Sequence, residues 1–377
     1  MKMFATTAPG LEDVCAAELK ELIGVEPQVD VGKVFFNDSV EAIYTVNFSS
    51  RLINRLFIQV LREKGVSKLE DVYRLMKSVD YEDLIPPDKT FAIKSERVGK
   101  HDFTSLDVSR VAGQAVIDSY IESKGLKLRV NLDEPDVEIW VFLRYDELIV
   151  GINTTGEGLH KRRYRVYSHP AALKTTIAAG MLRIGEYKGQ PLLDPLCGGG
   201  TIPVEAAHLA RRVPIVVFRR DYLFRNLKLY DPSLEADIAE KLIQTSRRDI
   251  YEIYCMDISS KHLRGALENA RSALVDDTIK FLLGDATRKE SYKGINASLV
   301  VTNPPYGIRS HRIEKIGEFY ESFAKVLADV FPGARLVLIT ASVKQFEQAT
   351  EKVGLEIEHQ RTVMHGGLTT RIYKVKL

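Results

Sequence analysis

The spacing of apolar side chains predicts alternating helices and strands in the first 155 residues. Apolar residues recur at helical intervals over 105–124, whereas residues 137–144 and 147–153 alternate between apolar and polar. The two alternating runs predict a β-hairpin that turns at Tyr145 and Asp146. By the same criteria we expect further strands at 3–6, 33–36, 52–60 and 91–95, and helices at 10–22, 40–47 and 69–77.

The periodic pattern breaks between residues 156 and 170. Glycine and basic residues replace it there, and Lys161, Arg162, Arg163 and Arg165 follow one another closely. We interpret this segment as a basic linker, because few core contacts cross a domain boundary. The predicted organisation is an N-terminal region at 1–155, the linker at 156–170 and a C-terminal domain at 171–377.

Beyond the linker, helix and strand patterns alternate in the order of an α/β fold. This order is typical of a doubly wound sheet whose strands run mostly parallel. An insertion at 213–250 separates the second helix from the second strand. The predicted helices lie at 171–184, 201–212, 261–274 and 314–330, and the predicted strands at 191–194, 251–256, 279–283, 297–302 and 335–340.

Composition narrows the class of protein. A chain of 377 residues is too long for one hydrophobic core, and no apolar run approaches the roughly 20 residues that span a bilayer. The N-terminus lacks the apolar core of a signal peptide. Cys15, Cys197 and Cys255 show no paired metal-ligand spacing, so we expect reduced thiols, no metal and a cytoplasmic location. The net charge of +2 does not by itself indicate a nucleic-acid partner.

Candidate cofactor chemistry follows three successive predicted strands. The first runs into the loop 194–201, Asp-Pro-Leu-Cys-Gly-Gly-Gly-Thr, whose glycines admit a ligand and whose amides at a helix N-terminus can receive a carboxylate. Asp257 ends the second strand, placed to accept ribose hydroxyls, and Asp285 follows the third, placed to accept adenine amino hydrogens. Either aspartate alone is more often a turn or cap residue, but coincidence at successive strand ends is improbable. The candidate cofactor residues are Asp194, Leu196, Cys197, Gly198, Gly199, Gly200, Thr201, Asp257, Ile258, Asp285, Ala286 and Asn303.

The fourth strand ends in the motif Asn303-Pro304-Pro305-Tyr306, the candidate catalytic residues. Two prolines hold the backbone extended and leave carbonyl oxygens that no continuing ladder can satisfy. The Asn303 side-chain oxygen and the Pro304 carbonyl could accept both hydrogens of an aromatic amino group, while the base stacks on Tyr306. The motif therefore predicts chemistry on an exocyclic amine. Cys197 lies in the cofactor loop, so we expect it to pack there and not to act as a nucleophile.

These motifs resemble class I S-adenosylmethionine methyltransferases that act on amino groups. The N-terminal part resembles THUMP-containing RNA-modifying enzymes, and the resemblance covers essentially the whole chain. It is strongest to the tRNA (guanine-N2)-methyltransferases that modify guanosine 6 of the acceptor stem. A related group that modifies guanosine 10 usually carries aspartate where this chain has Asn303. The matching segments are 91–97, 101–105, 130–132, 135–137, 158–165 and 169–173.

The resemblance implies a Rossmann-like methyltransferase domain with a seven-stranded, mostly parallel sheet, behind a ferredoxin-like plus THUMP RNA-binding region. It implies S-adenosyl-L-methionine as cofactor and tRNA as partner, with base flipping if the target is paired. Methylation of guanosine 10, of a ribosomal RNA guanosine or of DNA adenine stays open, as does an inactive RNA-binding module. The sequence gives no reason to infer an obligatory protein partner. The candidate RNA-binding residues are Lys94, Arg97, Lys100, His101, Lys161, Arg162, Arg163 and Arg165.

Overall fold

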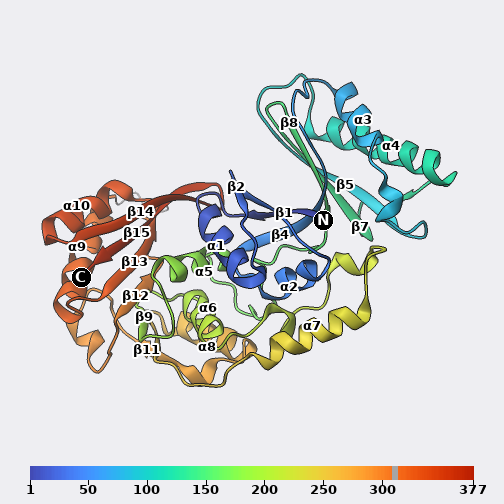
Figure 1. Ribbon diagram of the computed structural model, residues 1–377. Helices are drawn as coiled ribbons and strands as arrows, with labels where there is room; N and C mark the ends of the chain where they lie inside the picture. Colours follow the sequence, from blue (N-terminus) through green and yellow to red (C-terminus); the bar gives the residue numbers. More distant parts are fainter. Residues whose placement is uncertain (308–312) are drawn as a thin grey trace.

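Two β-sheets organise the chain in the computed structural model, which describes residues 1–307 and 313–377 (Figure 1). The N-terminal sheet has eight strands in the order β2-β3-β1-β4-β8-β7-β5-β6. Strand β4 pairs with both β1 and β8, so a single sheet runs through the whole N-terminal region. The strands are β1 (Lys2–Thr7), β2 (Gln28–Asp30), β3 (Lys33–Asn37), β4 (Ile53–Glu63), β5 (Thr90–Val98), β6 (Arg129–Val130), β7 (Val137–Arg144) and β8 (Glu147–Asn153).

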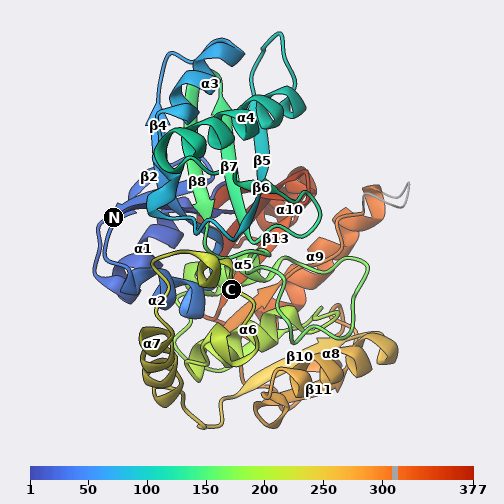
Figure 2. The same cartoon turned by 90° about the vertical axis from the view of Figure 1, so that its right-hand side faces the viewer.

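Helices cover one face of the N-terminal sheet, and their apolar sides form one core with it (Figure 2). The opposite face carries a separate aromatic cluster that includes Phe4, Phe57 and Phe142. The predicted helix at 105–124 and the predicted hairpin strands match the structure in their bounds. The helices are α1 (Glu12–Ile23), α2 (Glu41–Ser49), α3 (Leu69–Lys77), the 3-10 turn η1 (Tyr81–Asp83) and α4 (Ser105–Lys124).

The C-terminal sheet has seven strands in the order β11-β10-β9-β12-β13-β15-β14. The first five are parallel, and the last two form an antiparallel hairpin against β13. The seven-stranded, mostly parallel sheet implied by the resemblance is therefore confirmed. The strands are β9 (Leu192–Asp194), β10 (Ile253–Asp257), β11 (Ile279–Leu283), β12 (Leu299–Thr302), β13 (Arg335–Thr340), β14 (Glu356–His365) and β15 (Leu368–Lys376).

Helices pack on both faces of this sheet, which buries it as a layer between two apolar cores. Helices α5, α6 and α8 contribute to one core, and α9 and α10 to the other. No helix in the described ranges is long and apolar enough to cross a membrane. The helices are α5 (Thr175–Ile184), α6 (Thr201–Ala210), α8 (Ser260–Ser272), α9 (Ile313–Val330) and α10 (Val343–Val353), with 3-10 turns η4 (Asp276–Thr278) and η5 (Lys289–Tyr292).

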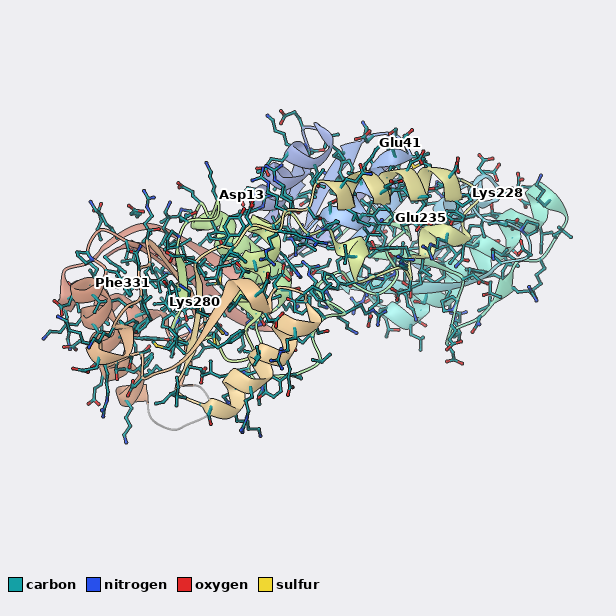
Figure 3. All side chains as sticks on the ribbon, turned by 90° about the horizontal axis from the view of Figure 1, so that it is seen from below. Asp13, Glu41, Lys228, Glu235, Lys280 and Phe331 are labelled. Carbon is teal, nitrogen blue, oxygen red and sulfur yellow. The ribbon has the colours of Figure 1, made fainter. Side chains whose placement is uncertain are left out.

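The insertion at 213–250 packs against the N-terminal region. It contains η2 (Ile215–Val217), η3 (Leu223–Asn226) and helix α7 (Pro232–Gln244), which begins where the Asp231 side chain accepts the Ser233 and Leu234 amides. The Phe224 ring lies 4.8 Å from that of Tyr44 on α2. Figure 3 labels Glu235 on α7 and Glu41 on α2, the two helices that meet here. The insertion thus joins the N-terminal core, a contact that its sequence did not predict.

One expectation for the C-terminal domain needs correction, and three elements there were not predicted. The predicted helix at 171–184 begins only at Thr175, and Lys174 before it has an extended backbone. Residues 169–173 instead form an irregular strap that lines a cavity of the C-terminal domain. Helix α10 and the hairpin β14–β15 were not predicted, although Gly366-Gly367 between two polar-alternating runs is a hairpin signal.

Candidate functional site

A cavity of about 740 Å³ opens at the carboxyl ends of β9 and β12. The chain leaves β9 toward β10 on one side, and β12 then pairs with β9 on the other, so strand order reverses here. Open α/β sheets bind their ligands at such a reversal, and typical ligand pockets measure roughly 300–1,000 Å³. The cavity is large enough for a nucleoside ligand together with part of a second molecule. Its lining comes from residues 169–173, 194, 196–199, 201–202, 257–258, 303–307, 365–366 and 368.

The loop after β9 is fixed by buried hydrogen bonds. Thr302 Oγ1 donates to Asp194 Oδ1 at 2.8 Å, and the Leu196 amide donates to the same oxygen at 3.2 Å. Burial raises the pKa of Asp194 to about 7. The Gly198 amide donates to Asp257 Oδ2 at 2.9 Å, which ties the loop to the end of β10. The structure thus brings together Gly198 of the predicted cofactor loop and Asp257, the aspartate predicted at the end of the second strand.

The same loop offers unsatisfied donors to a ligand. No acceptor within the described part of the chain bonds to the amides of Gly199 and Thr201, at the N-terminus of α6. Such amides receive anions, and the carboxylate of an S-adenosylmethionine would fit them. Asp257 lines the cavity, and each of its carboxylate oxygens accepts one amide, from Gly198 and from Ser259, which leaves further lone pairs for a ligand. Ile258 beside it is 67% exposed and offers apolar surface. The loop amides, the Asp257 carboxylate and the Ile258 side chain thus offer donors, an acceptor and apolar surface to a ligand.

Three predicted cofactor residues lie outside the cavity lining. Gly200 is the N-cap of α6, with φ of 75°, and its amide donates to the Cys197 carbonyl. The Asp285 carboxylate accepts the Thr287 amide and hydroxyl at 2.9 and 2.7 Å. These bonds lower the pKa of Asp285. The adenine contact of Asp285 and Ala286 stays a prediction.

The motif after β12 presents acceptors to the cavity. The Tyr306 hydroxyl donates to Asn303 Oδ1 at 2.7 Å, and the Tyr320 hydroxyl donates to the Pro305 carbonyl at 3.1 Å. None of the described residues donates to the Pro304 carbonyl. An entering amino group can therefore use Pro304 directly, and can share Asn303 Oδ1 with the tyrosine or displace it. This arrangement suits an aromatic amine.

Cys197 is buried in the cofactor loop, with its sulfur 2.6 Å from that of Cys255 on β10. Burial raises the pKa of both thiols, so neither is a thiolate near neutral pH. This agrees with the expected packing role of Cys197.

The candidate RNA residues of the N-terminal region lie along β5 and the turn after it. Arg97 donates to the Gly99 carbonyl at 2.9 Å and contacts His101 at 3.1 Å. His101 Nε2 in turn lies 2.6 Å from the Tyr145 carbonyl oxygen. Lys100 is exposed beside them, whereas Lys94 is half-buried. Arg97 and His101 thus shape a turn that carries an exposed lysine.

The basic linker divides into exposed and buried cations. Lys161 and Arg163 are exposed and form ion pairs with Glu157 at 2.9 and 3.3 Å. Arg165 is half-buried and donates to Thr201 Oγ1 at 2.9 Å, next to the cofactor loop. The assignment of Arg162 to the RNA surface is wrong in this structure. Its side chain is only 3% exposed because it pairs with Glu205 on α6.

Part of the cavity wall was not predicted from the sequence. The strap at 169–173 lines the cavity, and the His169 side chain packs within 3.5 Å of the space that a Cβ at Gly198 would occupy. His365, Gly366 and Leu368 at the tip of the hairpin line it as well. From the sequence, residues 169–173 were recognised only as a segment that matches the family, and not as part of the cavity wall. The Gly-Gly turn could have indicated the hairpin, but no local signal indicates which cavity its tip meets.

The strand order, with a cavity at the sheet reversal, is that of a class I methyltransferase fold. The family described as "RMKL-like, methyltransferase domain" matches residues 162–371, more than half of the chain. The THUMP domain family matches residues 66–153, and the RlmL ferredoxin-like domain family matches residues 2–57. The chain belongs to the RMKL-like methyltransferases, with S-adenosylmethionine as methyl donor.

Full-length relatives support this membership. A tRNA (guanine(6)-N2)-methyltransferase of Archaeoglobus fulgidus is 43% identical over 99% of this chain and 91% of its own length. One of the same name from Methanocaldococcus jannaschii is 38% identical over 100% of both chains. The crystal structure of a possible methylase from Clostridium difficile 630 superposes with a TM-score of 0.88 at 25% identity, over 99% of this chain and 97% of that one.

Proposed function

We propose that this enzyme transfers a methyl group from S-adenosylmethionine to the exocyclic N2 of guanosine 6 in tRNA. The observation that carries the proposal is that the acceptors of Asn303 and Pro304 open into the same cavity as the cofactor loop. The choice of tRNA and of position 6 is supported by the names of the two full-length archaeal relatives.

The proposed role of the motif is to prepare a weak nucleophile. The N2 lone pair of guanine is delocalised into the ring, so it attacks poorly while the amino group stays planar. Hydrogen bonds from N2 to Asn303 Oδ1 and to the Pro304 carbonyl would hold the amino group out of the ring plane and direct its lone pair. When bound, S-adenosylmethionine supplies an electrophilic methyl group. Positioning and preorganised acceptors of this kind account for large rate effects without a covalent nucleophile.

The base must leave a paired stem to enter the cavity, which costs a few kcal/mol of unstacking. The face of Tyr306 is half-buried beside Asn303 and offers a stacking surface that offsets part of that cost. We propose that the N-terminal region binds the rest of the RNA through shape and phosphate contacts. A tRNA substrate and the buried reduced thiols support a cytoplasmic location.

The test is methylation of unmodified tRNA transcripts with labelled S-adenosylmethionine, followed by nucleoside analysis and mapping. We expect N2-methylguanosine at position 6, and no product from a matched transcript with adenosine there. Product at guanosine 10 of tRNA would show that the target position is different. Product in ribosomal RNA or duplex DNA, with none in tRNA, would show that the substrate is a different nucleic acid. Cofactor binding by calorimetry without turnover on any nucleic acid would instead indicate a binding module.

A further inference from the structure

The tip of the hairpin β14–β15 projects over the cavity. Strand β15 pairs antiparallel with β13, and Arg371 lies opposite Thr340, the last residue of β13. Residues 365–370 therefore extend beyond the carboxyl end of the parallel strands. Because β12 lies between β9 and β13, the hairpin is separated from the cofactor loop by the strand that carries the Asn-Pro-Pro-Tyr motif.

His365 is part of this wall. Its Nδ1 is buried on the inner side and has no hydrogen-bond partner among the described residues. Burial, reinforced by the positive charge of Lys174, lowers the pKa of His365, so the imidazole is neutral near pH 7. No hydrogen bond among the described residues engages Nε2, the other ring nitrogen, so Nε2 is the atom that can bond to a ligand in the cavity.

The hairpin tip is held in place from the N-terminal region. The Met364 amide donates to the Pro9 carbonyl at 3.0 Å. Arg361 forms a two-pronged ion pair with Asp13 at 2.7 and 3.0 Å. A Cβ at Gly10 would lie 2.0 Å from the Thr362 carbonyl oxygen, so the turn after β1 and the hairpin are in direct backbone contact. His365 is thus set in a defined position rather than on a free loop.

Among the histidine, carboxylate, amide and hydroxyl side chains that line the described cavity, His365 is the one to which we have assigned neither the cofactor nor the target amino group. Four belong to the cofactor loop or contact it, and Asn303 and Tyr306 are assigned to the target amino group. The four on the cofactor side are His169, Asp194, Thr201 and Asp257.

We propose that His365 is a specificity-determining residue that hydrogen-bonds the Watson–Crick edge of the flipped guanine, at O6 or N1–H. This inference rests on the proposed function. Once N2 is held by Asn303 and Pro304, the neighbouring N1–H and O6 have lost their pairing partner and need a new one. A neutral imidazole can donate to O6 or accept from N1–H. A site built on such a bond rejects bases that lack these groups.

The test compares two synthetic tRNA acceptor-stem substrates, one with guanine and one with 2-aminopurine at the target position. 2-Aminopurine keeps the amino group but lacks both O6 and N1–H. The two bases differ in intrinsic reactivity, but that difference cancels when their kcat/KM ratio is compared between enzyme variants. We expect His365→Phe to lower the preference for guanine about 10- to 100-fold, mainly by slowing the guanine substrate. His365→Gln, which can still donate and accept, should retain part of the preference.

Controls separate this role from a general disturbance of the hairpin. Met364→Leu alters the adjacent residue, which does not line the cavity, and should leave the ratio unchanged. An equal loss on both substrates in His365→Phe, or no loss on either, would overturn the assignment of His365 while leaving the proposed function intact. Failure of the unsubstituted enzyme to methylate the guanine substrate would overturn both.

Discussion

Arg162 Nε donates to Glu205 Oε1 at 3.2 Å, and the two side chains are only 3% and 0% exposed. Arg51 of the N-terminal region reaches the other carboxylate oxygen at 2.9 Å, and the Tyr164 hydroxyl donates to Oε1 at 2.8 Å. A single carboxylate on α6 therefore joins the N-terminal region, the linker and the methyltransferase domain. The linker is a structural part of this junction.

Replacing Glu205 with glutamine should destabilise the protein by about 3–5 kcal/mol, because it leaves two buried guanidinium groups without a counter-charge. Burial alone would raise the pKa of Glu205, but Arg162 and Arg51 outweigh it and lower the pKa to about 2. A lowered pKa stabilises the fold above pH 4.5, and this contribution is lost as the pH falls toward 2. Urea unfolding should therefore show a large difference between variant and wild type at pH 7 that shrinks at pH 3. A constant difference would refute the electrostatic origin.

Asp257→Ala should weaken S-adenosylmethionine binding by about 2 kcal/mol, since the carboxylate both faces the cavity and holds the Gly198 amide. Titration calorimetry measures this directly. Asp285→Ala in the same experiment tests the predicted adenine contact. In the structure the Asp285 carboxylate accepts the Thr287 amide, so wild-type affinity in this variant would leave Asp285 with that local role alone. If Asp257→Ala bound S-adenosylmethionine with wild-type affinity, Asp257 would have only a local structural role and would not bind the cofactor.

Asn303→Ala should slow single-turnover methylation about 100-fold or more while cofactor affinity stays near that of the wild type. The matched variant is Tyr306→Phe, which removes the hydroxyl that donates to Asn303 but keeps the stacking face. We expect it to lose less than about tenfold, since only a neutral hydrogen bond disappears. Retention of more than a tenth of the rate in Asn303→Ala would contradict the proposed role.

Binding of tRNA should weaken steeply with salt, because phosphate contacts release counterions. Lys100→Ala and Arg163→Ala remove exposed cations, and each true phosphate contact should reduce the salt slope by about one. Lys352→Ala, an exposed lysine on α10 paired with Glu321, is the matched control. Unchanged slopes for Lys100 and Arg163 would exclude both from the RNA surface.

A chain truncated to residues 168–377 should aggregate. Leu11 packs against α5 so closely that a Cβ at Gly180 would lie 2.7 Å from it, and Tyr222 and Phe224 complete the N-terminal core. Removing residues 1–167 exposes all of these apolar surfaces. Size-exclusion chromatography should show a non-aggregated species, a 1:1 complex, only when residues 1–167 are co-expressed in trans. A monodisperse truncated chain that binds cofactor would contradict this.

The sequence predicted what depends on local patterns. Helix α4 and the β7–β8 hairpin follow from periodicity, and Asp194, Asp257 and Asn303 follow from their places at strand ends. Each such signal lies within about 20 residues of chain, where backbone geometry alone decides which side chains share a face or an edge.

Long-range packing decided the rest. Arg162 was predicted to bind RNA because its partner Glu205 lies 43 residues away and leaves no signal near it in the sequence. Likewise, His365 lines the cavity only because β15 pairs with β13 and the turn at Gly10 supports the hairpin. Neither arrangement leaves a local pattern that differs from an ordinary basic loop or an ordinary hairpin.

The chain passes between its two sheets more than once, and this constrains how such an enzyme can be recombined. The insertion at 213–250 returns to the N-terminal core, and Met364 reaches back to Pro9. A chimera that joins the recognition region of one family member to the catalytic sheet of another at residues 156–170 would leave Tyr222 and Phe224 facing a foreign surface. Productive exchanges must carry the insertion along, so substrate choice and catalysis are expected to be inherited as one unit.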